Sequence, residues 1–112
     1  MDLRINSEEI ISKSKKFLAW DNRKVIGRAY LYILENDLHD NPFGFIEDVF
    51  VEENYRGQGI GSRLVEEMIK EARKRNCYKI ILTSRHSKPK VHKLYEKAGF
   101  REHGLEFRMD LN

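Results

Sequence analysis

A glycine-rich stretch in the middle of the chain carries the clearest chemical signal in the sequence. Residues 56–62 (RGQGIGS) separate an apolar run, Phe43–Val51, from a segment with helical periodicity. Glycines between a strand and a helix let backbone N–H groups approach a ligand closely. The N-terminus of the following helix attracts anions, because its first N–H groups lack partners and its dipole is positive there. The pattern predicts a phosphate-binding turn.

Two common phosphate-binding patterns do not fit this stretch. A dinucleotide fingerprint, G-x-G-x-x-G, counted from Gly57 and Gly59, would need a third glycine where Ser62 stands. A P-loop needs a Gly-Lys-Ser/Thr sequence after four spacer residues, and the stretch has no such lysine. What remains is R-x-x-G-x-G. Taken alone, the stretch also fits a glycine-rich turn that merely enters a helix.

Three other side chains could move a proton. Tyr95 carries a phenol that stays protonated at neutral pH and can donate to a leaving group, although a tyrosine beside Leu94 could equally pack against a sheet. Glu47 and Asp48 lie inside the apolar strand, where poor solvation tends to raise the pKa of a carboxyl group. Alternation predicts that Glu47 shares a face with Val49. Whether Glu47, Asp48 or a water molecule acts as a base stays open.

Metal chemistry and cysteine chemistry are not indicated. The four histidines show no metal-ligand spacing, and the single cysteine, Cys77, is expected to pack at a helix end. We therefore expect no metal and no covalent intermediate on the cysteine.

The elements that must position these residues alternate between strands and helices. Residues 1–5 are predicted to form a short strand, and Asn6 with Glu9 to start a helix that ends near residue 15. Residues 17–20 and 25–34 predict an antiparallel hairpin around an Asp/Asn turn, followed by a loop at 35–42.

The second half predicts a strand–helix–strand unit. The helix is expected at about residues 62–76, followed by a central parallel strand at 78–83. Pro89 suits the first turn of a second helix that ends at Gly99, and residues 100–111 offer one or two final strands. The predicted order is β-α-β-β-β-α-β-α-β, a mixed α/β domain.

Composition bounds the class of protein. The 112 residues are 40% hydrophobic and 35% charged, which predicts one globular domain, residues 1–112. No run has the length of a membrane span, and the net charge of +3 is too balanced to indicate nucleic acid. With one cysteine, a cytoplasmic location is the expectation, with neither membrane nor nucleic acid as partner.

Three motifs together resemble the GNAT superfamily of N-acetyltransferases. They are the R-x-x-G-x-G turn, LYEKAGF at residues 94–100, and the hairpin with LAWD at 18–21 followed by VIG at 25–27. They cover residues 17–100, most of the chain. The resemblance implies a mixed, mostly antiparallel sheet with a splayed central pair of parallel strands and flanking helices.

The resemblance also implies an acetyl-CoA site. Pantetheine would lie along Val49, Phe50 and Val51, and Tyr95 would act as general acid towards the departing sulfur. Lys88 stands where many members have asparagine, and its charge could meet a phosphate. The pyrophosphate would be held by Arg56, Gly57, Gln58, Gly59, Ile60, Gly61 and Ser62.

The acceptor is an amine whose identity the sequence leaves open. The run IEDVFVEENYRGQGIG at 46–61 resembles glucosamine-phosphate and polyamine acetyltransferases, so a small amine is favoured, with Glu47 binding or deprotonating it. The segment 6–16 is shorter than the helical segment of most members, which suggests an open acceptor groove or one completed in a homodimer. The alternatives are a protein or peptide N-acetyltransferase and a non-catalytic acyl-CoA-binding module.

Overall fold

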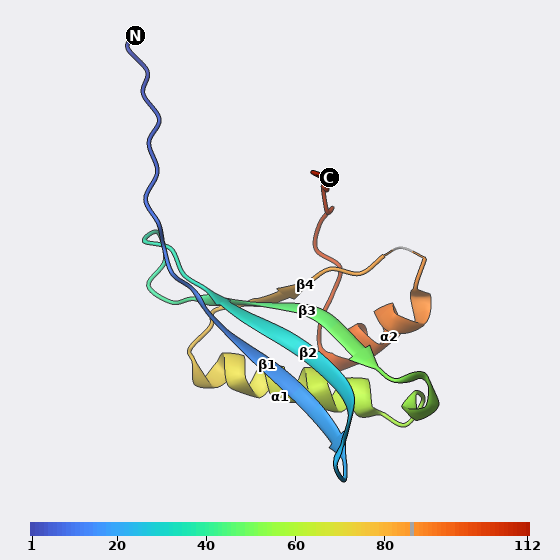
Figure 1. Ribbon diagram of the computed structural model, residues 1–112. Coiled ribbons are helices and arrows are strands. Elements are labelled where there is room, and N and C mark those ends of the chain that lie inside the picture. The colour runs from blue at the N-terminus through green and yellow to red at the C-terminus, as the bar shows by residue number, and fades with distance from the viewer. Residues whose placement is uncertain (86) are drawn as a thin grey trace.

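The computed structural model describes residues 1–85 and 87–112, so His86 lies outside the described residues. Four strands form one sheet in the order β1-β2-β3-β4, and both helices lie on the same side of it (Figure 1). The elements are β1 (Lys13–Asp21), β2 (Lys24–Leu34), β3 (Phe43–Val51), a 3-10 turn (Glu53–Tyr55), α1 (Ile60–Lys74), β4 (Ile80–Leu82) and α2 (Pro89–Ala98). The predicted class, a mixed and mostly antiparallel α/β fold, is confirmed.

The predicted hairpin is confirmed and is longer than the sequence indicated. β1 pairs antiparallel with β2 from Lys13↔Ile33 to Asp21↔Lys24. The turn between them places Asn22 at φ 53°, in the left-handed region that asparagine tolerates better than most residues. The Asp/Asn pattern therefore located the turn correctly.

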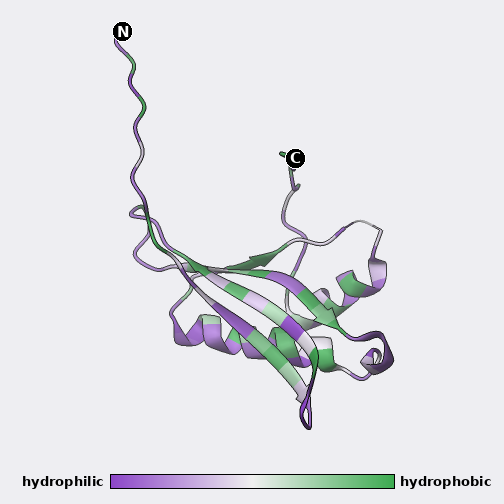
Figure 2. Cartoon of the chain, viewed as in Figure 1, coloured by the Kyte–Doolittle hydropathy of each residue, from purple (hydrophilic) through white to green (hydrophobic). Residues whose placement is uncertain are grey.

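The core lies between the sheet and one face of α1. Residues three and four apart on α1 are buried because they share one face of a helix, and alternate residues of β2 are buried because they share one face of a strand. The buried cluster comprises Ala29, Leu31, Ile33, Ile46, Leu64, Val65 and Met68. In Figure 2 the hairpin tip and the loop after β3 are hydrophilic, whereas green bands mark the strands between them.

The parallel pair β3/β4 is confirmed, but β4 is an edge strand, not a central one. It has three residues, Ile80–Leu82, where the sequence predicted a strand over 78–83. Pairing runs from Gly44↔Ile80 to Ile46↔Leu82, while β3 continues to Val51. Beyond this point the chain that leaves β4 runs away from the end of β3 (Figure 1). The second half of β3 thus has no strand neighbour on that side among the described residues.

Both ends of the chain differ from the prediction. Residues 1–12 form no helix or strand, so the expected strand at 1–5 and helix at 6–15 are wrong, and Lys13 already belongs to β1. Residues 100–112 likewise form no strand. Short local patterns are marginal without tertiary packing, and residues 1–12 and 101–112 are exposed throughout, whereas Phe100 packs against the core. A capping pair or an alternating pattern did not suffice without a buried partner surface.

The helix boundaries shift slightly from those expected. α1 begins at Ile60, two residues before the predicted Ser62, and ends at Lys74. α2 begins at Pro89, as predicted, and Gly99 follows it with φ 111° as a C-terminal cap. Across the described residues, no helix is both long enough and apolar enough to span a membrane.

Candidate active site

The glycine-rich turn connects the 3-10 turn after β3 to the first residue of α1. Gly57 has φ 81° and Gly59 has φ 83°, and both values lie in the region that a side chain makes costly. Gly59 is the N-cap of α1 and makes no side-chain cap. Gly61 differs, because it lies within α1 without a positive φ. Gly57 and Gly59 thus stand at the two positions of the turn whose backbone conformation favours glycine.

The first turn of α1 presents unpaired backbone donors. The first backbone hydrogen bond of the helix runs from Arg63 N to Gly59 O, 3.0 Å. The N–H groups from Gly59 to Ser62 precede it, and no partner for them is recorded among residues 1–85 and 87–112. The first turn also contains no acidic side chain. These donors and the positive end of the helix fit the pyrophosphate of a nucleotide-type ligand.

Three elements meet beside the turn. A Cβ built on Gly61 would lie 3.8 Å from Leu94 Cδ1 of α2 and 3.9 Å from Val51 Cγ2 of β3. The end of β3, the start of α1 and the middle of α2 therefore converge at one glycine. The fold brings together two predicted cofactor residues, Val51 and Gly61, and the immediate neighbour of Tyr95.

The backbone of Val51 faces the side of β3 that β4 has left. Val51 is registered opposite Gly27, and the next residue, Glu52, donates its N–H to Ile26 O at 2.8 Å. Hydrogen-bonded and non-hydrogen-bonded pairs alternate in an antiparallel ladder, so the polar groups of Val51 point away from β2. Arg56 Nε already donates to Val51 O at 2.8 Å. The Val51 carbonyl thus anchors the turn, whereas no partner for the Val51 N–H is recorded among the residues that the structure describes.

Arg56 also contributes charge beside the turn. Its guanidinium carbon lies 5.5 Å from the centre of the Phe50 ring, and that of Arg28 lies 4.6 Å from the same ring. Both distances allow cation–π attraction. The exposed Phe50 side chain therefore holds two guanidinium groups near the glycine-rich turn, where positive charge would favour an anionic ligand.

Tyr95 lies half-buried on α2 against the core. Its ring makes an edge contact with Phe100 at a centroid distance of 6.1 Å, and its backbone carbonyl accepts a hydrogen bond from Phe100 N at 3.0 Å. Burial raises the pKa of the Tyr95 phenol above its usual value. The group consequently holds its proton at neutral pH and can act only as a donor there.

A β-bulge overturns the predicted faces of β3. Tyr30 pairs with Glu47 and Arg28 with Phe50, so Ala29 opposes two residues, Asp48 and Val49. Asp48 has φ 53°, and the alternation reverses there.

The reversal separates residues that simple alternation placed together. Val49 and Val51 pack against the core cluster, whereas Glu47, Asp48 and Phe50 are exposed. The prediction that Glu47 and Val49 share a face is wrong. The expected burial of a carboxylate in this strand is also wrong, because neither Glu47 nor Asp48 is buried.

Lys88 occupies the N-cap of α2, as its place in the sequence suggested. Its backbone N–H donates to Arg85 O at 3.1 Å, and its carbonyl accepts from His92 N at 3.2 Å. Its exposed side chain has no hydrogen bond or ion pair recorded within the described ranges. A role for Lys88 at a cofactor phosphate stays a prediction.

Other titratable residues do not form a second centre. Among the described residues, no three side chains of His, Cys, Asp or Glu gather as metal ligands. His92 Nε2 lies 2.6 Å from Arg85 O, and His39 stacks on Tyr78 with centroids 5.0 Å apart. Burial raises the pKa of the Cys77 thiol, which disfavours the nucleophilic thiolate.

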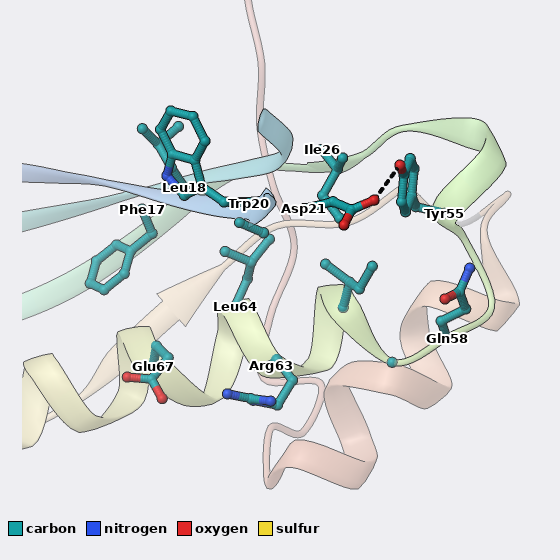
Figure 3. A pocket seen from close by; sticks show the side chains of 13 residues that line it. Phe17, Leu18, Trp20, Asp21, Ile26, Tyr55, Gln58, Arg63, Leu64 and Glu67 are labelled. Atoms are coloured by element: carbon teal, nitrogen blue, oxygen red, sulfur yellow. Dashed lines mark hydrogen bonds between the residues drawn. The ribbon is translucent and has the colours of Figure 1, made fainter. Parts of the chain in front are cut away.

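A contact beside the glycine-rich turn was not predicted from the sequence. Tyr55 donates a hydrogen bond to Asp21 at the tip of the hairpin, across 34 positions of sequence (Figure 3). Both residues border a cavity of about 560 Å³ between β1 and the start of α1, whose floor includes Phe17, Ile26 and Leu64. The sequence marked Asp21 as a turn residue within the LAWD motif but gave no contact with Tyr55, because a contact between distant polar side chains leaves no local pattern.

A profile of the Acetyltransferase (GNAT) family matches residues 2–100 of this chain. The chain belongs to the GNAT family. The resemblance read from the glycine-rich turn and LYEKAGF is confirmed at the level of the family.

Named GNAT relatives differ in their acceptors. The chain is 36% identical over 99 residues to a glucosamine 6-phosphate N-acetyltransferase of Trypanosoma brucei brucei, which covers 88% of this chain. It is 29% identical over 98 residues, 86% of its length, to an N-alpha-acetyltransferase 30 of Schizosaccharomyces pombe. The chain spans 65% of the length of the trypanosomal relative and 63% of the yeast one.

Solved structures support the same GNAT fold. A Trypanosoma brucei acetyltransferase superposes with a TM-score of 0.74 at 35% identity, covering 88% of this chain and 68% of the other. A glucosamine-6-phosphate N-acetyltransferase from Arabidopsis thaliana superposes with a TM-score of 0.71 at 28% identity, covering 80% and 59%. The arrangement of β3, the glycine-rich turn and α1 thus belongs to a known acetyltransferase fold.

Proposed function

We propose that this chain transfers an acetyl group from acetyl-CoA to a primary amine by direct attack, with a small amine favoured as acceptor. The observation that carries the proposal is the convergence at Gly61, where unpaired N–H donors of α1, the free edge of β3 and the α2 segment that bears Tyr95 meet. The family match to residues 2–100 supports the same reaction.

Acetyl-CoA supplies an activated acyl group as a thioester. The chain would bind the pyrophosphate through residues 56–62. Arg56 holds the turn by its hydrogen bond to the Val51 carbonyl, and the glycines leave the backbone N–H groups accessible. Residues 49–51 would hold the pantetheine arm along the edge of β3 opposite β2. The backbone groups of Val51 face that edge, whereas those of Phe50 point to β2, so Phe50 could contribute only through its side chain. These contacts orient the thioester and lower the entropic barrier to attack.

Proton movements at both reactants complete the transfer. The acceptor must first lose a proton, since an ammonium group has no lone pair; its nitrogen then bonds to the acyl carbon, loses a second proton as the amide forms, and the carbon–sulfur bond breaks. Tyr95 is a protonated donor held on α2, and it would deliver its proton to the departing thiolate. One of the two protons lost by the nitrogen can restore the phenol through solvent and the other is released, so the balance closes without a further reactant.

The choice of a small amine rests on relatives and on the exposed face of β3. Matches named glucosamine 6-phosphate N-acetyltransferase have 31% to 38% identity, whereas those named N-alpha-acetyltransferase 30 have 29% to 31%. Glu47 is exposed on β3 and could attract an ammonium group, while Arg28 and Arg56 add positive charge nearby. An amine that also bears an anionic group, such as an amino-sugar phosphate, suits this mixture.

The test is acceptor-dependent release of free CoA thiol. A panel of amino-sugar phosphates, polyamines, amino acids and peptides with free N-termini would be supplied with acetyl-CoA. We expect thiol release with at least one small amine and slower release with peptides. Preference for peptides would make the chain a protein N-acetyltransferase. Binding of acetyl-CoA, seen as a rise in Tm, without thiol release from any acceptor would indicate a non-catalytic module.

Replacing Glu47 by Gln tests the role of its carboxylate. The variant keeps the shape of an exposed side chain but loses its charge, so we expect a higher KM for the amine, by about tenfold, and an unchanged KM for acetyl-CoA. Steady-state kinetics across pH would measure both constants. Glu53→Gln, in the 3-10 turn, is the matched control. Wild-type rates for Glu47→Gln at every pH would remove Glu47 from the site and leave Asp48 or water as the proton acceptor.

A further inference from the structure

The glycine-rich turn has little packing of its own. At Gly57 and Gly59, among the described residues other than the glycine and its two chain neighbours, no atom lies within 4 Å of the position that a Cβ would take. Backbone that is exposed and free of side-chain contacts samples several conformations unless neighbouring segments restrain it. The position of these N–H groups therefore depends on what holds the residues immediately before them.

Those preceding residues are attached to the tip of the β1–β2 hairpin. The 3-10 turn Glu53–Tyr55 ends two residues before Gly57. Tyr55 Oη donates to Asp21 Oδ2 at 2.7 Å, and Lys24 Nζ lies 3.2 Å from Glu52 Oε2. Lys24 Nζ also lies 5.7 Å from the centre of the Tyr55 ring. Two residues of the hairpin tip thus contact two residues that lead into the turn.

The contact between Tyr55 and Asp21 is short and directional. A hydrogen bond to a carboxylate is stronger than one between neutral groups, and 2.7 Å is in the range of such bonds. Acting as donor to Asp21 raises the pKa of Tyr55, which keeps the donor proton in place at neutral pH. In Figure 3 the Tyr55 side chain extends from the loop to Asp21 at the rim of the cavity, and Gln58 lies farther along the same loop.

We propose that Tyr55 and Asp21 are positioning residues, which hold the glycine-rich turn in the conformation that binds the pyrophosphate of acetyl-CoA. The inference rests on the proposed function for its ligand, but the restraint itself is a property of the protein alone. Neither side chain lies in the turn, so neither is expected to touch the acetyl group or the amine. Their effect should be confined to the affinity for the donor.

The expected result is a selective loss of donor affinity. Tyr55→Phe and Asp21→Ala should each raise the Kd for CoA, and the KM for acetyl-CoA, by about threefold to tenfold, because each loses the same hydrogen bond. The variant with both substitutions should bind CoA no more weakly than whichever single variant has the lower affinity. Neither kcat nor the KM for the amine should change, and this pattern distinguishes positioning from a general loss of structure.

Two controls keep the test specific. Asp21→Asn retains a carbonyl oxygen that can accept from Tyr55, so it should recover most of the affinity that Asp21→Ala loses. Arg23→Ala changes a charge at the same hairpin tip, where no hydrogen bond or ion pair of Arg23 is recorded in the described part of the chain, and it should match the wild type. Tm values for all variants would identify any that fail to fold.

Hydrogen exchange tests the restraint without any ligand. Amide protons of residues 57–61 should exchange faster in Tyr55→Phe and Asp21→Ala than in the wild type or Arg23→Ala. Exchange at the wild-type rate in both variants would overturn the proposal. If the wild-type chain failed to bind CoA, the proposed function would be wrong, and the exchange rates would still decide whether the hairpin tip positions the turn.

Discussion

Replacing Tyr95 by Phe is expected to lower kcat by about 100-fold or more, since loss of a general acid typically costs a factor of 10² to 10⁴. The variant removes the phenolic proton that is proposed to reach the departing sulfur, while the ring keeps its contact with Phe100. No hydrogen bond of the phenol is recorded within residues 1–85 and 87–112, so the deletion leaves no partner unsatisfied. Affinity for CoA and the Tm at neutral pH should stay near wild type. Thiol release and equilibrium binding would measure the two effects separately.

The matched control for Tyr95→Phe is Tyr78→Phe. Tyr78 is also partly exposed and also contacts an aromatic ring, that of Phe43, at 6.3 Å. It precedes β4 and should leave kcat unchanged. A Tyr95→Phe variant with wild-type kcat would show that water or another group protonates the sulfur.

The burial of Tyr95 also predicts a change in stability at high pH. Its pKa is higher in the folded chain than the value of about 10 expected when unfolded. The raised pKa of Tyr95 therefore contributes stability that is fully present below about pH 10. This stability is lost as pH rises through the pKa that Tyr95 has in the folded chain. Tyr95→Phe has no phenol at this position, so the part of the stability loss at alkaline pH that comes from Tyr95 should disappear. Thermal unfolding of both proteins between neutral and strongly alkaline pH would measure it.

Replacing Gly59 by Ala should weaken both the fold and the binding of acetyl-CoA. Gly59 has φ 83°, where a Cβ costs about 1 to 2 kcal/mol. Any shift that relieves this strain moves the first N–H groups of α1, so we expect the Kd for CoA to rise by about tenfold or more. Thermal unfolding and calorimetric binding would report the two effects.

Two other glycines separate strain from binding. Gly61→Ala places a Cβ at ordinary contact distance, 3.8 Å from Leu94 Cδ1, without a positive φ, so its Tm should not fall. If phosphate approaches this turn of the helix, the same variant should still bind CoA more weakly. Gly104→Ala, with no atom within 4 Å of the added methyl, should change neither quantity. Wild-type CoA affinity in both Gly59→Ala and Gly61→Ala would contradict the placement of the pyrophosphate.

Much of the fold could be predicted because its signals are local. The bounds of β3 were predicted to the residue, since Phe43–Val51 is an apolar run with breakers on both sides. The caps of α2 were predicted from Pro89 and Gly99, whose backbone preferences hold in any context. The hairpin followed from Asp21 and Asn22 between two strands. In each case the residues themselves restrict the backbone.

The failures occurred where a distant partner decides the outcome. Residues 1–15 and 100–111 carry patterns for a helix and strands, but no helix or strand forms before Lys13 or after α2, because a local pattern needs a surface to bury against. The separation of Glu47 from Val49 onto opposite faces depends on the bulge at Asp48, which is defined by the pairing of β3 with β2. Alternation along a single strand cannot predict that register, because the register depends on the partner strand.

The sequence by itself predicted the donor side of the proposed site. Glycines at positions that need positive φ, a helix start without an acidic residue and a tyrosine in LYEKAGF predict a phosphate-binding turn and a proton donor through their own chemistry. Only the tertiary structure decided which backbone edge of β3 is free, which face Glu47 occupies, and that Asp21 supports the turn through Tyr55. Backbone preference is a property of single residues, whereas register and long-range hydrogen bonds exist only once the strands have paired.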